Sequence, residues 1–287
     1  MIVILFLKLL ICKMSKPIIS QLIIFPIKSL GPVALQHVEV DSLGLVGDRR
    51  FMLVSETGQF ITQRTRPDLT RFALKLYGSD YLIMDQLTQN HRVLSVNPVL
   101  GDWVDVTLWD DEIHVREVAD GISAWFSELL NESVRLVQIQ SSAPRSIESK
   151  YQTTGSQQSS FADSLPILLA SEASYQAVEH HFGASFDWMR FRANVIISGA
   201  KAFEEDSWLE FSLGTVRLFG AKPCARCQLV NVNPATGEVD KSMLEVLSRF
   251  RKVGNKVYFG QQAVPVVSGR IAVGDEIHVE KSKDALL

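Results

Sequence analysis

The order of hydrophobic and polar residues along the chain predicts many short strands and few helices. Residues 18–26 (IISQLIIFP) are apolar and β-branched, which is typical of a buried strand. Short apolar runs then follow one another between turn residues, and residues 56–58 (ETG) predict a hairpin turn. We expect further strands at residues 33–40, 50–55, 59–63, 72–77, 81–85, 93–96, 104–109, 112–117 and 134–138.

Helical periodicity appears in three segments of the chain. Residues 122–130 (ISAWFSELL) repeat apolar side chains at intervals of three and four. A second helix is predicted at residues 171–181, with Ser171 as its N-cap, and a third at residues 243–251. Residues 165–169 are apolar, and the second half adds short strands at residues 195–198, 209–211, 215–219, 229–232 and 277–279. The pattern predicts an α+β, mostly β protein whose second half is barrel-like.

Two segments stand apart from this pattern. Residues 141–160 are polar and rich in Ser, Gln and Thr, which predicts a long mobile loop of the kind that often serves as a lid. Residues 1–11 are almost entirely apolar but too short to span a bilayer as a helix, and no signal-peptide cleavage site follows them. We interpret residues 1–17 as a tail, disordered or preceding a true start at Met14, and expect no stable membrane insertion.

Composition narrows the classes of function. The formal net charge is −3, so the chain as a whole has no electrostatic attraction to nucleic acid, and we expect no nucleic-acid partner. The three cysteines are Cys12, Cys224 and Cys227. An odd, small number does not suit a disulfide framework and favours a reducing, cytoplasmic location. It is also too few for an internal iron–sulfur cluster.

The sharpest chemical motif is residues 222–227 (KPCARC). Neighbouring cations favour the thiolate form of a cysteine, which ligates metals or attacks electrophiles. Four interpretations remain open from spacing alone: half of a zinc site, a thioredoxin-like redox pair, one thiolate holding a metal whose other ligands come from a cofactor, or two inert cysteines. The first lacks a second pair of ligands in the sequence, and the second should open a helix, whereas a strand is predicted here.

Basic residues in three other segments suggest an anion site. Lys28 and Ser29 follow the first strand within PIKSL at 26–30, where an ammonium, a hydroxyl and free backbone amides suit a phosphate. Arg49 lies in a basic pair, and the arginines of residues 62–66 (TQRTR) flank the same predicted hairpin. Arg192 and Asn194 are two residues apart, so an extended backbone would put their side chains on the same face. Each signal alone also fits a solvated charged surface.

Taken together, the motifs resemble those of MOSC-domain proteins, a family that includes the amidoxime-reducing components and the C-terminal domain of molybdenum cofactor sulfurase. The resemblance covers residue 18 to about residue 279. It rests on PIKSL at 26–30, GLVGDRRFMLV at 44–54, ITQR at 61–64, ADSLPILLASEAS at 162–174, FRANVIISG at 191–199, EEDSW at 204–208 and PCARCQLVNVNPATGEV at 223–239.

The resemblance implies an N-terminal β-barrel-like domain at residues 18–135, packed on a MOSC β-barrel with a few helices at residues 136–287. It implies a molybdenum–molybdopterin cofactor whose metal is ligated by Cys227, which is also the catalytic residue. The cofactor-binding positions that it implies are Lys28, Ser29, Arg49, Ser164, Leu165, Arg192, Asn194, Ala225 and Arg226. Leu165 and Ala225 would contribute main-chain groups only.

The implied activity is the reduction of small N-hydroxylated compounds. Bacterial relatives often carry a ferredoxin domain with a cysteine cluster, and this sequence lacks those cysteines. We therefore expect electrons from a separate carrier protein of ferredoxin, flavodoxin or cytochrome type. Two alternatives stay open: a non-catalytic module that carries the cofactor or sulfur, and a thiol–disulfide protein that uses Cys224 and Cys227.

Overall fold

The computed structural model describes residues 16–140 and 145–286. The expected tail and the question of a start at Met14 fall outside the described residues, apart from Lys16 and Pro17 at the end of that segment. Across the described part of the chain, no helix combines the length and the apolar character needed to cross a membrane.

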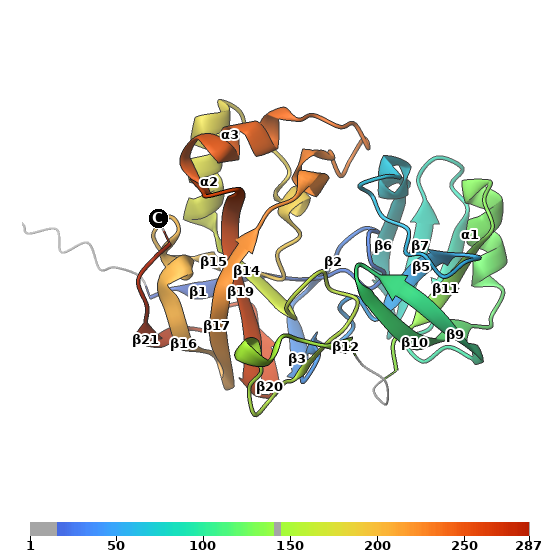
Figure 1. Ribbon diagram of the computed structural model, residues 1–287, viewed down its shortest axis with the longest axis horizontal. Coiled ribbons are helices and arrows are strands. Elements are labelled where there is room, and N and C mark those ends of the chain that lie inside the picture. Colours follow the sequence, from blue (N-terminus) through green and yellow to red (C-terminus); the bar gives the residue numbers. More distant parts are fainter. Residues whose placement is uncertain (1–15, 141–144, 287) are drawn as a thin grey trace, which may run out of the picture.

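The largest sheet builds one half of the molecule (Figure 1). Its strands run in the order β2-β1-β15-β14-β19-β17-β16-β21, with β18 beside β19, and β14–β15 is its one parallel pair. The members are β1 (Ile18–Ile24), β2 (Val33–Leu35), β14 (Ile167–Ser171), β15 (Val195–Ser198), β16 (Trp208–Leu213), β17 (Val216–Ala225), β18 (Lys252–Val253), β19 (Lys256–Val267) and β21 (Ile277–Ser282).

The other half is built from two smaller sheets and a helix. One sheet has the order β5-β11-β10-β9, with β5 (Phe51–Ser55), β9 (Leu100–Leu108), β10 (Asp111–Val118) and β11 (Val134–Gln138). The other has the order β6-β7-β8, with β6 (Phe72–Tyr77), β7 (Asp80–Asp85) and β8 (His91–Leu94). Two small sheets complete the strands: the sheet β20-β3-β4, with β3 (His37–Asp41), β4 (Gly44–Leu45) and β20 (Gly269–Ala272), and the ribbon of β12 (Arg145–Ser146) and β13 (Gln158–Ser159).

The three predicted helices are present: α1 (Ile122–Leu130), α2 (Glu172–Phe182) and α3 (Ser242–Phe250). Ser171 caps α2 as expected, because its Oγ accepts a hydrogen bond from the amide of Ser174, and Gly183 ends the helix at φ 82°. Short 3₁₀ turns complete the fold: η1 (Pro67–Arg71), η2 (Ser149–Tyr151), η3 (Trp188–Phe191), η4 (Glu204–Ser207) and η5 (Gln228–Asn231).

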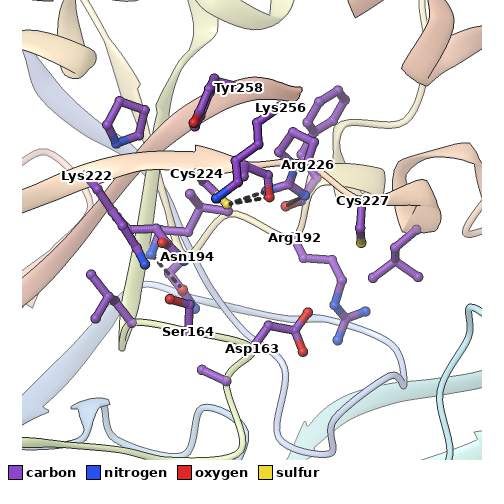
Figure 2. Close-up of a pocket in the computed structure, with 18 of the residues that line it drawn as sticks. Asp163, Ser164, Arg192, Asn194, Lys222, Cys224, Arg226, Cys227, Lys256 and Tyr258 are labelled. Atoms are coloured by element: carbon purple, nitrogen blue, oxygen red, sulfur yellow. Dashed lines mark hydrogen bonds between the residues drawn. The ribbon is translucent and has the colours of Figure 1, made fainter. Parts of the chain in front are cut away.

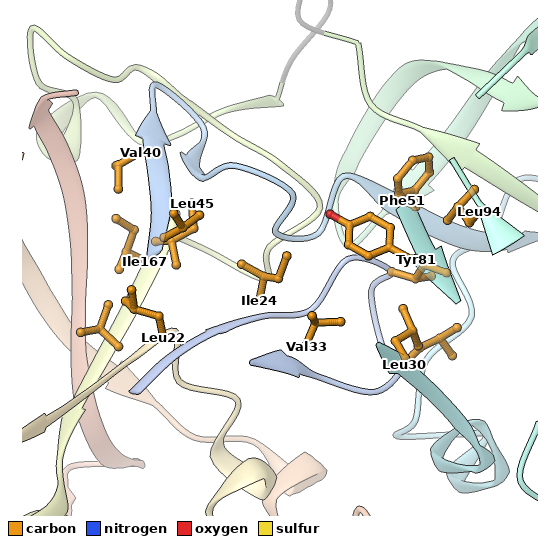
Figure 3. Packing of buried hydrophobic residues seen from close by; sticks show 14 of the residues in the cluster. Leu22, Ile24, Leu30, Val33, Val40, Leu45, Phe51, Tyr81, Leu94 and Ile167 are labelled. Carbon is orange, nitrogen blue, oxygen red and sulfur yellow. The ribbon is translucent and has the colours of Figure 1, made fainter. Parts of the chain in front are cut away.

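One continuous hydrophobic core joins the two halves (Figure 3). Leu22 on β1 lies beside Ile167 of the large sheet, Ile24 lies between the two halves, and the same cluster continues through Leu30 to Tyr81 of the small sheet. The first strand therefore belongs by pairing to the large sheet, while the chain that leaves it enters the other half. Residues 25–30 lie at this crossing, where the functional side chains gather.

The structure corrects three of the local expectations. Residues 229–232 do not form the predicted strand, because residues 228–231 form the 3₁₀ turn η5. An apolar run this short has no periodicity by which a strand can be told from a helical turn. Residues 59–63 make only isolated bridges. Residues 145–160, expected as loop, hold the β12–β13 ribbon, where Ser156 Oγ donates to the backbone carbonyl of Ser42 and so satisfies a buried hydroxyl.

Candidate functional site

All ten predicted site residues line one cavity of about 420 Å³ between the two halves of the molecule (Figure 2). This volume is within the range of pockets that hold small molecules or cofactors. The predicted lining residues are Lys28, Ser29, Arg49, Ser164, Leu165, Arg192, Asn194, Ala225, Arg226 and Cys227. They come from five separate segments of the chain, so the fold brings together what the sequence keeps apart.

Lys28 and Ser29 occupy the turn that follows β1. Ser29 has φ 67°, a left-handed conformation that residues other than glycine seldom adopt. Lys28 is 6% exposed, and its Nζ donates to the carbonyl of Phe161 at 2.8 Å and pairs with Asp163. Burial lowers the pKa of Lys28 to about 8, although Asp163 partly offsets this effect. The turn thus holds a buried ammonium at the base of the cavity.

Arg49 and Arg192 lie next to each other beside the ring of Phe25. Arg49 donates to Asn194 Oδ1 at 3.0 Å and to the carbonyl of Arg192 at 3.1 Å. Arg192 donates from Nη1 to the carbonyl of Leu30 at 3.0 Å, but its Nη2 has no partner among the described residues. Burial, reinforced by the like charge of Arg49, lowers the pKa of Arg192 to about 9. The buried Asp48 pairs with Arg49, so one adjoining carboxylate faces two guanidinium groups and the pair keeps a net positive charge.

The backbone from Arg192 to Asn194 is not extended, although their spacing of two residues suggested a strand with both side chains on one face. Arg192 is the C-cap of the 3₁₀ turn η3 and has a left-handed backbone conformation, with φ 55°. Asn194 is 1% exposed and serves the backbone: its Nδ2 donates to the carbonyl of Ile23 at 3.1 Å, and its Oδ1 accepts from the amide of Leu168 at 3.1 Å. Both residues still line the cavity, Asn194 as a support for Arg49.

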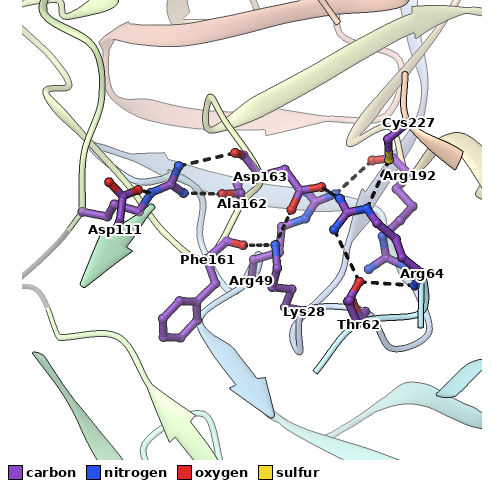
Figure 4. Close-up of polar contacts among 12 residues, drawn as sticks. Lys28, Arg49, Thr62, Arg64, Asp111, Phe161, Ala162, Asp163, Arg192 and Cys227 are labelled. Atoms are coloured by element: carbon purple, nitrogen blue, oxygen red, sulfur yellow. Dashed lines mark hydrogen bonds and ion pairs between the residues drawn. The ribbon is translucent and has the colours of Figure 1, made fainter. Parts of the chain in front are cut away.

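Asp163 and Arg64 are two further charged residues of the cavity (Figure 4). The sequence pointed to Arg64 only as one of the arginines of residues 62–66, and it did not point to Asp163. Asp163 accepts from Lys28 and, at 2.6 Å, from Arg64 Nη2. Burial alone would raise the pKa of Asp163, but Lys28 and Arg64 hold it well below its usual range. Arg64 also stacks on the ring of Trp109 at 4.3 Å. Both residues lie within the family motifs, and only the tertiary structure shows that they meet.

Cys227 and Cys224 differ in their surroundings. Cys227 is exposed at the cavity and accepts a hydrogen bond from Arg64 Nε at 3.3 Å, whereas Cys224 is buried. Cys224 accepts from Arg226 Nη1 at 3.1 Å, and the same guanidinium donates to the carbonyl of Phe191 at 2.8 Å. Arg226 is therefore held in place beneath the motif, and Cys227 is the thiol that a ligand in the cavity could reach.

The lining side chains fit an anionic ligand that also carries a thiophilic atom. Eight lysines and arginines line the cavity against Asp163 and Glu148 as the acidic side chains, although the whole chain is slightly acidic. The unpartnered Nη2 of Arg192 is a donor of the kind that phosphate oxygens accept from. Within the described residues, no group of three or more His, Cys, Asp or Glu side chains could hold a metal. Cys227 could thus offer one ligand to a metal whose other ligands belong to a cofactor.

Family models match almost the full length of the described chain. The model for the MOSC N-terminal beta barrel domain matches residues 16–133, and the model for the MOSC domain matches residues 156–278. The mostly β architecture, with its two halves, is the one that the sequence pattern and the resemblance predicted.

Curated relatives agree with these matches. The mitochondrial amidoxime reducing component 2 of Rattus norvegicus is 31% identical over 279 residues, which cover 91% of this chain and 82% of that protein. The mitochondrial amidoxime-reducing component 1 of Xenopus laevis is 29% identical, with 91% and 81% covered. The molybdenum cofactor sulfurase of Oryza sativa subsp. japonica is 26% identical, covering 84% of this chain and 32% of that protein. The chain therefore belongs to the MOSC-domain family that includes the amidoxime-reducing components.

Proposed function

We propose that this protein binds a molybdenum–molybdopterin cofactor through Cys227 and reduces small N-hydroxylated compounds. The observation that carries the proposal is the position of the exposed Cys227 thiol at a cavity whose interior holds Lys28, Arg49 and Arg192. Thiolates are suited to soft transition metals, and arginine and lysine to phosphates. The names of the relatives support the same chemistry at about 30% identity.

Each side chain has a role in holding such a cofactor. Lys28, Ser29, Arg49 and Arg192 would bind the phosphate, with the free Nη2 of Arg192 as one donor. Main-chain groups of Leu165 and Ala225, the Ser164 hydroxyl and the Arg226 segment would face the pterin. Asn194 would act indirectly, because its Oδ1 fixes the Arg49 guanidinium at 3.0 Å. In this proposal each residue that the resemblance implied would contact the cofactor or support a residue that does.

The reaction needs two electrons and two protons, because it converts an N–OH group into N–H and releases the oxygen as water. The cofactor, when bound, would supply the two-electron reduction chemistry, and Cys227 would hold its metal. The chain's own residues would set the geometry: Arg64 would fix the Cys227 sulfur, and Asp163 would hold Arg64 in turn. The lysines and arginines that line the cavity would stabilise the negative charge that develops on the hydroxyl oxygen as the N–O bond breaks.

Electrons would come from a separate carrier protein. The sequence has three cysteines and no glycine-rich dinucleotide motif that opens a helix, so neither an internal iron–sulfur relay nor direct use of a nicotinamide is expected. A ferredoxin, flavodoxin or cytochrome would dock weakly, and its binding would weaken as salt rises. We expect the cytoplasm as the location, whereas the two amidoxime-reducing components named above are mitochondrial by name.

Turnover of benzamidoxime tests this function. Molybdenum-loaded protein should produce benzamidine with reduced methyl viologen as the donor and should produce none with NADH alone. The Cys227→Ser variant, carried through the same loading, is the matched control and should be inactive. Robust activity with NADH and this chain alone would contradict the need for a carrier.

A second candidate is a module that carries the cofactor or a sulfur atom without turning over a substrate. The match to molybdenum cofactor sulfurase favours it, because the matched part is about a third of that protein. Full molybdenum loading without turnover from any electron donor would favour this carrier, and transfer of the cofactor to a cofactor-free acceptor enzyme would then be the assay.

A further inference from the structure

The end of the cavity away from Lys28 carries a second basic group, which we call the outer lysines: Lys150, Lys222 and Lys256. None of them has a role in the proposed binding of the cofactor. Lys222 is on β17 and Lys256 is the first residue of β19, whereas Lys150 belongs to η2, in the segment that covers this end. Figure 2 shows Lys222, Lys256 and Tyr258 around the upper part of the cavity.

The outer lysines have little acidic compensation. Glu148 is the one acidic side chain that lines this end among the described residues, and it serves two lysines, Lys150 at 2.6 Å and Lys222 at 3.8 Å. Lys222 is 29% exposed, and burial lowers its pKa while Glu148 partly restores it. A half-buried ammonium with a distant, shared counter-ion gains from an additional anion.

An aromatic side chain lies beneath these cations. The ammonium of Lys222 stands 4.6 Å from the centre of the Tyr151 ring, and that of Lys150 stands 4.8 Å from it. Tyr258 lines the same end and is opposite Ala225 in the β17–β19 register. This end therefore offers positive charge together with flat aromatic surface, which suits a planar molecule that bears an anionic group.

Strand β17 sets the distance between the outer lysines and Cys227. Lys222 is three residues before Ala225, and the pairing of β17 with β19 is irregular between Pro223 and Ala225, so these two Cα atoms are at most about 10 Å apart. Cys227 follows two residues later. A small substrate could therefore place its reacting group near Cys227 and a second group near Lys222.

We propose that the outer lysines, above all Lys222, form a substrate subsite that selects N-hydroxylated compounds bearing a carboxylate or a phosphate. The proposal rests on the proposed function for the reacting group, but the anion subsite can be tested without turnover. When no substrate is bound, Glu148 forms ion pairs with Lys222 and Lys150, so its carboxylate competes with the substrate anion for these lysines. Removal of Glu148 and removal of Lys222 then have opposite effects on affinity.

The test is calorimetric binding of two ligands that share the amidoxime group: uncharged benzamidoxime and anionic 4-carboxybenzamidoxime. The protein is molybdenum-loaded and no electron donor is present. Wild-type protein should bind the carboxylate about tenfold more tightly, the ratio that corresponds to about 1.4 kcal/mol. Lys222→Gln should abolish this preference and leave benzamidoxime binding unchanged, whereas Glu148→Gln should increase the preference severalfold.

Two controls establish whether the preference for the carboxylate arises at the outer lysines. Lys252→Gln removes an exposed lysine on β18 that does not line the cavity, and it should keep the wild-type preference. Molybdenum content should be equal in all four proteins. Loss of molybdenum from Lys222→Gln would instead assign this lysine to the cofactor phosphate and overturn the proposal, as would equal affinity of wild-type protein for both ligands. Failure of turnover with any donor would contradict the proposed function and leave the binding result intact.

Discussion

Arg64 and Cys227 are in direct contact although 163 residues separate them: Arg64 Nε donates to Cys227 Sγ at 3.3 Å. Arg64 belongs to the half of the molecule that carries α1, and Cys227 follows β17 of the large sheet. The same guanidinium is held by Asp163 and by the face of Trp109. The contact thus fixes the exposed thiol by a side chain from the opposite wall of the cavity.

Replacement of Arg64 by Gln should impair the function of Cys227 without unfolding the protein. The variant loses a charge-assisted hydrogen bond to sulfur and one partner of Asp163, and such bonds contribute about 1.5–3 kcal/mol. We expect molybdenum content or kcat/KM for benzamidoxime to fall roughly tenfold or more. Arg66→Gln is the matched control, because Arg66 is in the same segment but pairs with Asp68 and Glu132. Equal losses in both variants would show that the contact with Cys227 has no special role.

Cys227 and Cys224 should respond differently to replacement by Ser. Cys227 is exposed at the cavity, whereas Cys224 is buried and accepts a hydrogen bond from Arg226. Cys227→Ser should abolish molybdenum retention, and Cys224→Ser should keep most of it. Metal analysis of the purified variants measures this, and equal metal content in the two would refute the assignment of Cys227 as the ligand.

Local sequence patterns predicted the helices well because their periodicity and caps are local. The observed α1 has the predicted bounds, and Ser171 caps α2. The main omission was β19, which is the central strand against both β14 and β17. Its residues are buried through most of its length, but Gly260, Gln261 and Gln262 interrupt the apolar run. Gly260 has φ 79°, and an added Cβ would lie 2.7 Å from the carbonyl of Leu169, so the interruption reflects close packing that no local pattern reveals.

The resemblance to family motifs predicted which residues belong to the candidate site, but not the contacts between them. Each of Lys28, Arg49 and Arg192 fits a solvated surface when considered alone, and it was the order of motifs that linked them. Arg64 and Asp163 belong to the same family motifs, yet nothing local indicates that they share an ion pair. Their roles depend on how the two halves of the molecule meet, which is a property of long-range packing.

Anion binding in the cavity should weaken as the pH rises above 8. Burial lowers the pKa of Lys28 to about 8, so this ammonium loses its charge in a range where ordinary lysines keep it. Sulfate, whose charge is constant here, is a suitable probe for the cofactor-free protein. Its Kd should rise severalfold between pH 7.5 and pH 9.5, measured by calorimetry.

The matched variant for this pH effect is Lys28→Gln. It should bind sulfate more weakly at pH 7.5 and should show a smaller change up to pH 9.5, because the ammonium that titrates in this range is absent. A pH dependence as steep as that of the wild-type protein would exclude Lys28 as a source of the effect.

The last prediction concerns Glu205, a buried carboxyl remote from the cavity lining. Its Oε1 accepts from the Ser171 amide and the Ser174 hydroxyl, while its Oε2 has no partner among the described residues. Burial raises the pKa of Glu205 to about 7, and Asp206 adds to the effect. Below pH 4.5 the group is protonated in both the folded and the unfolded chain, so it does not alter stability there.

Between pH 4.5 and pH 7 the unfolded chain releases this proton and the folded protein does not, so the contribution of Glu205 to the free energy of unfolding falls with rising pH and is constant above pH 7. The fall is at most on the order of 3 kcal/mol. Urea unfolding of Glu205→Gln and wild-type protein from pH 5 to pH 8 should show a stability difference in favour of the variant that grows with pH and levels off near pH 7. Glu128→Gln, at an exposed position on α1, should show no such trend. A constant difference between Glu205→Gln and wild type across this range would mean that the pKa of Glu205 is not raised in the folded protein.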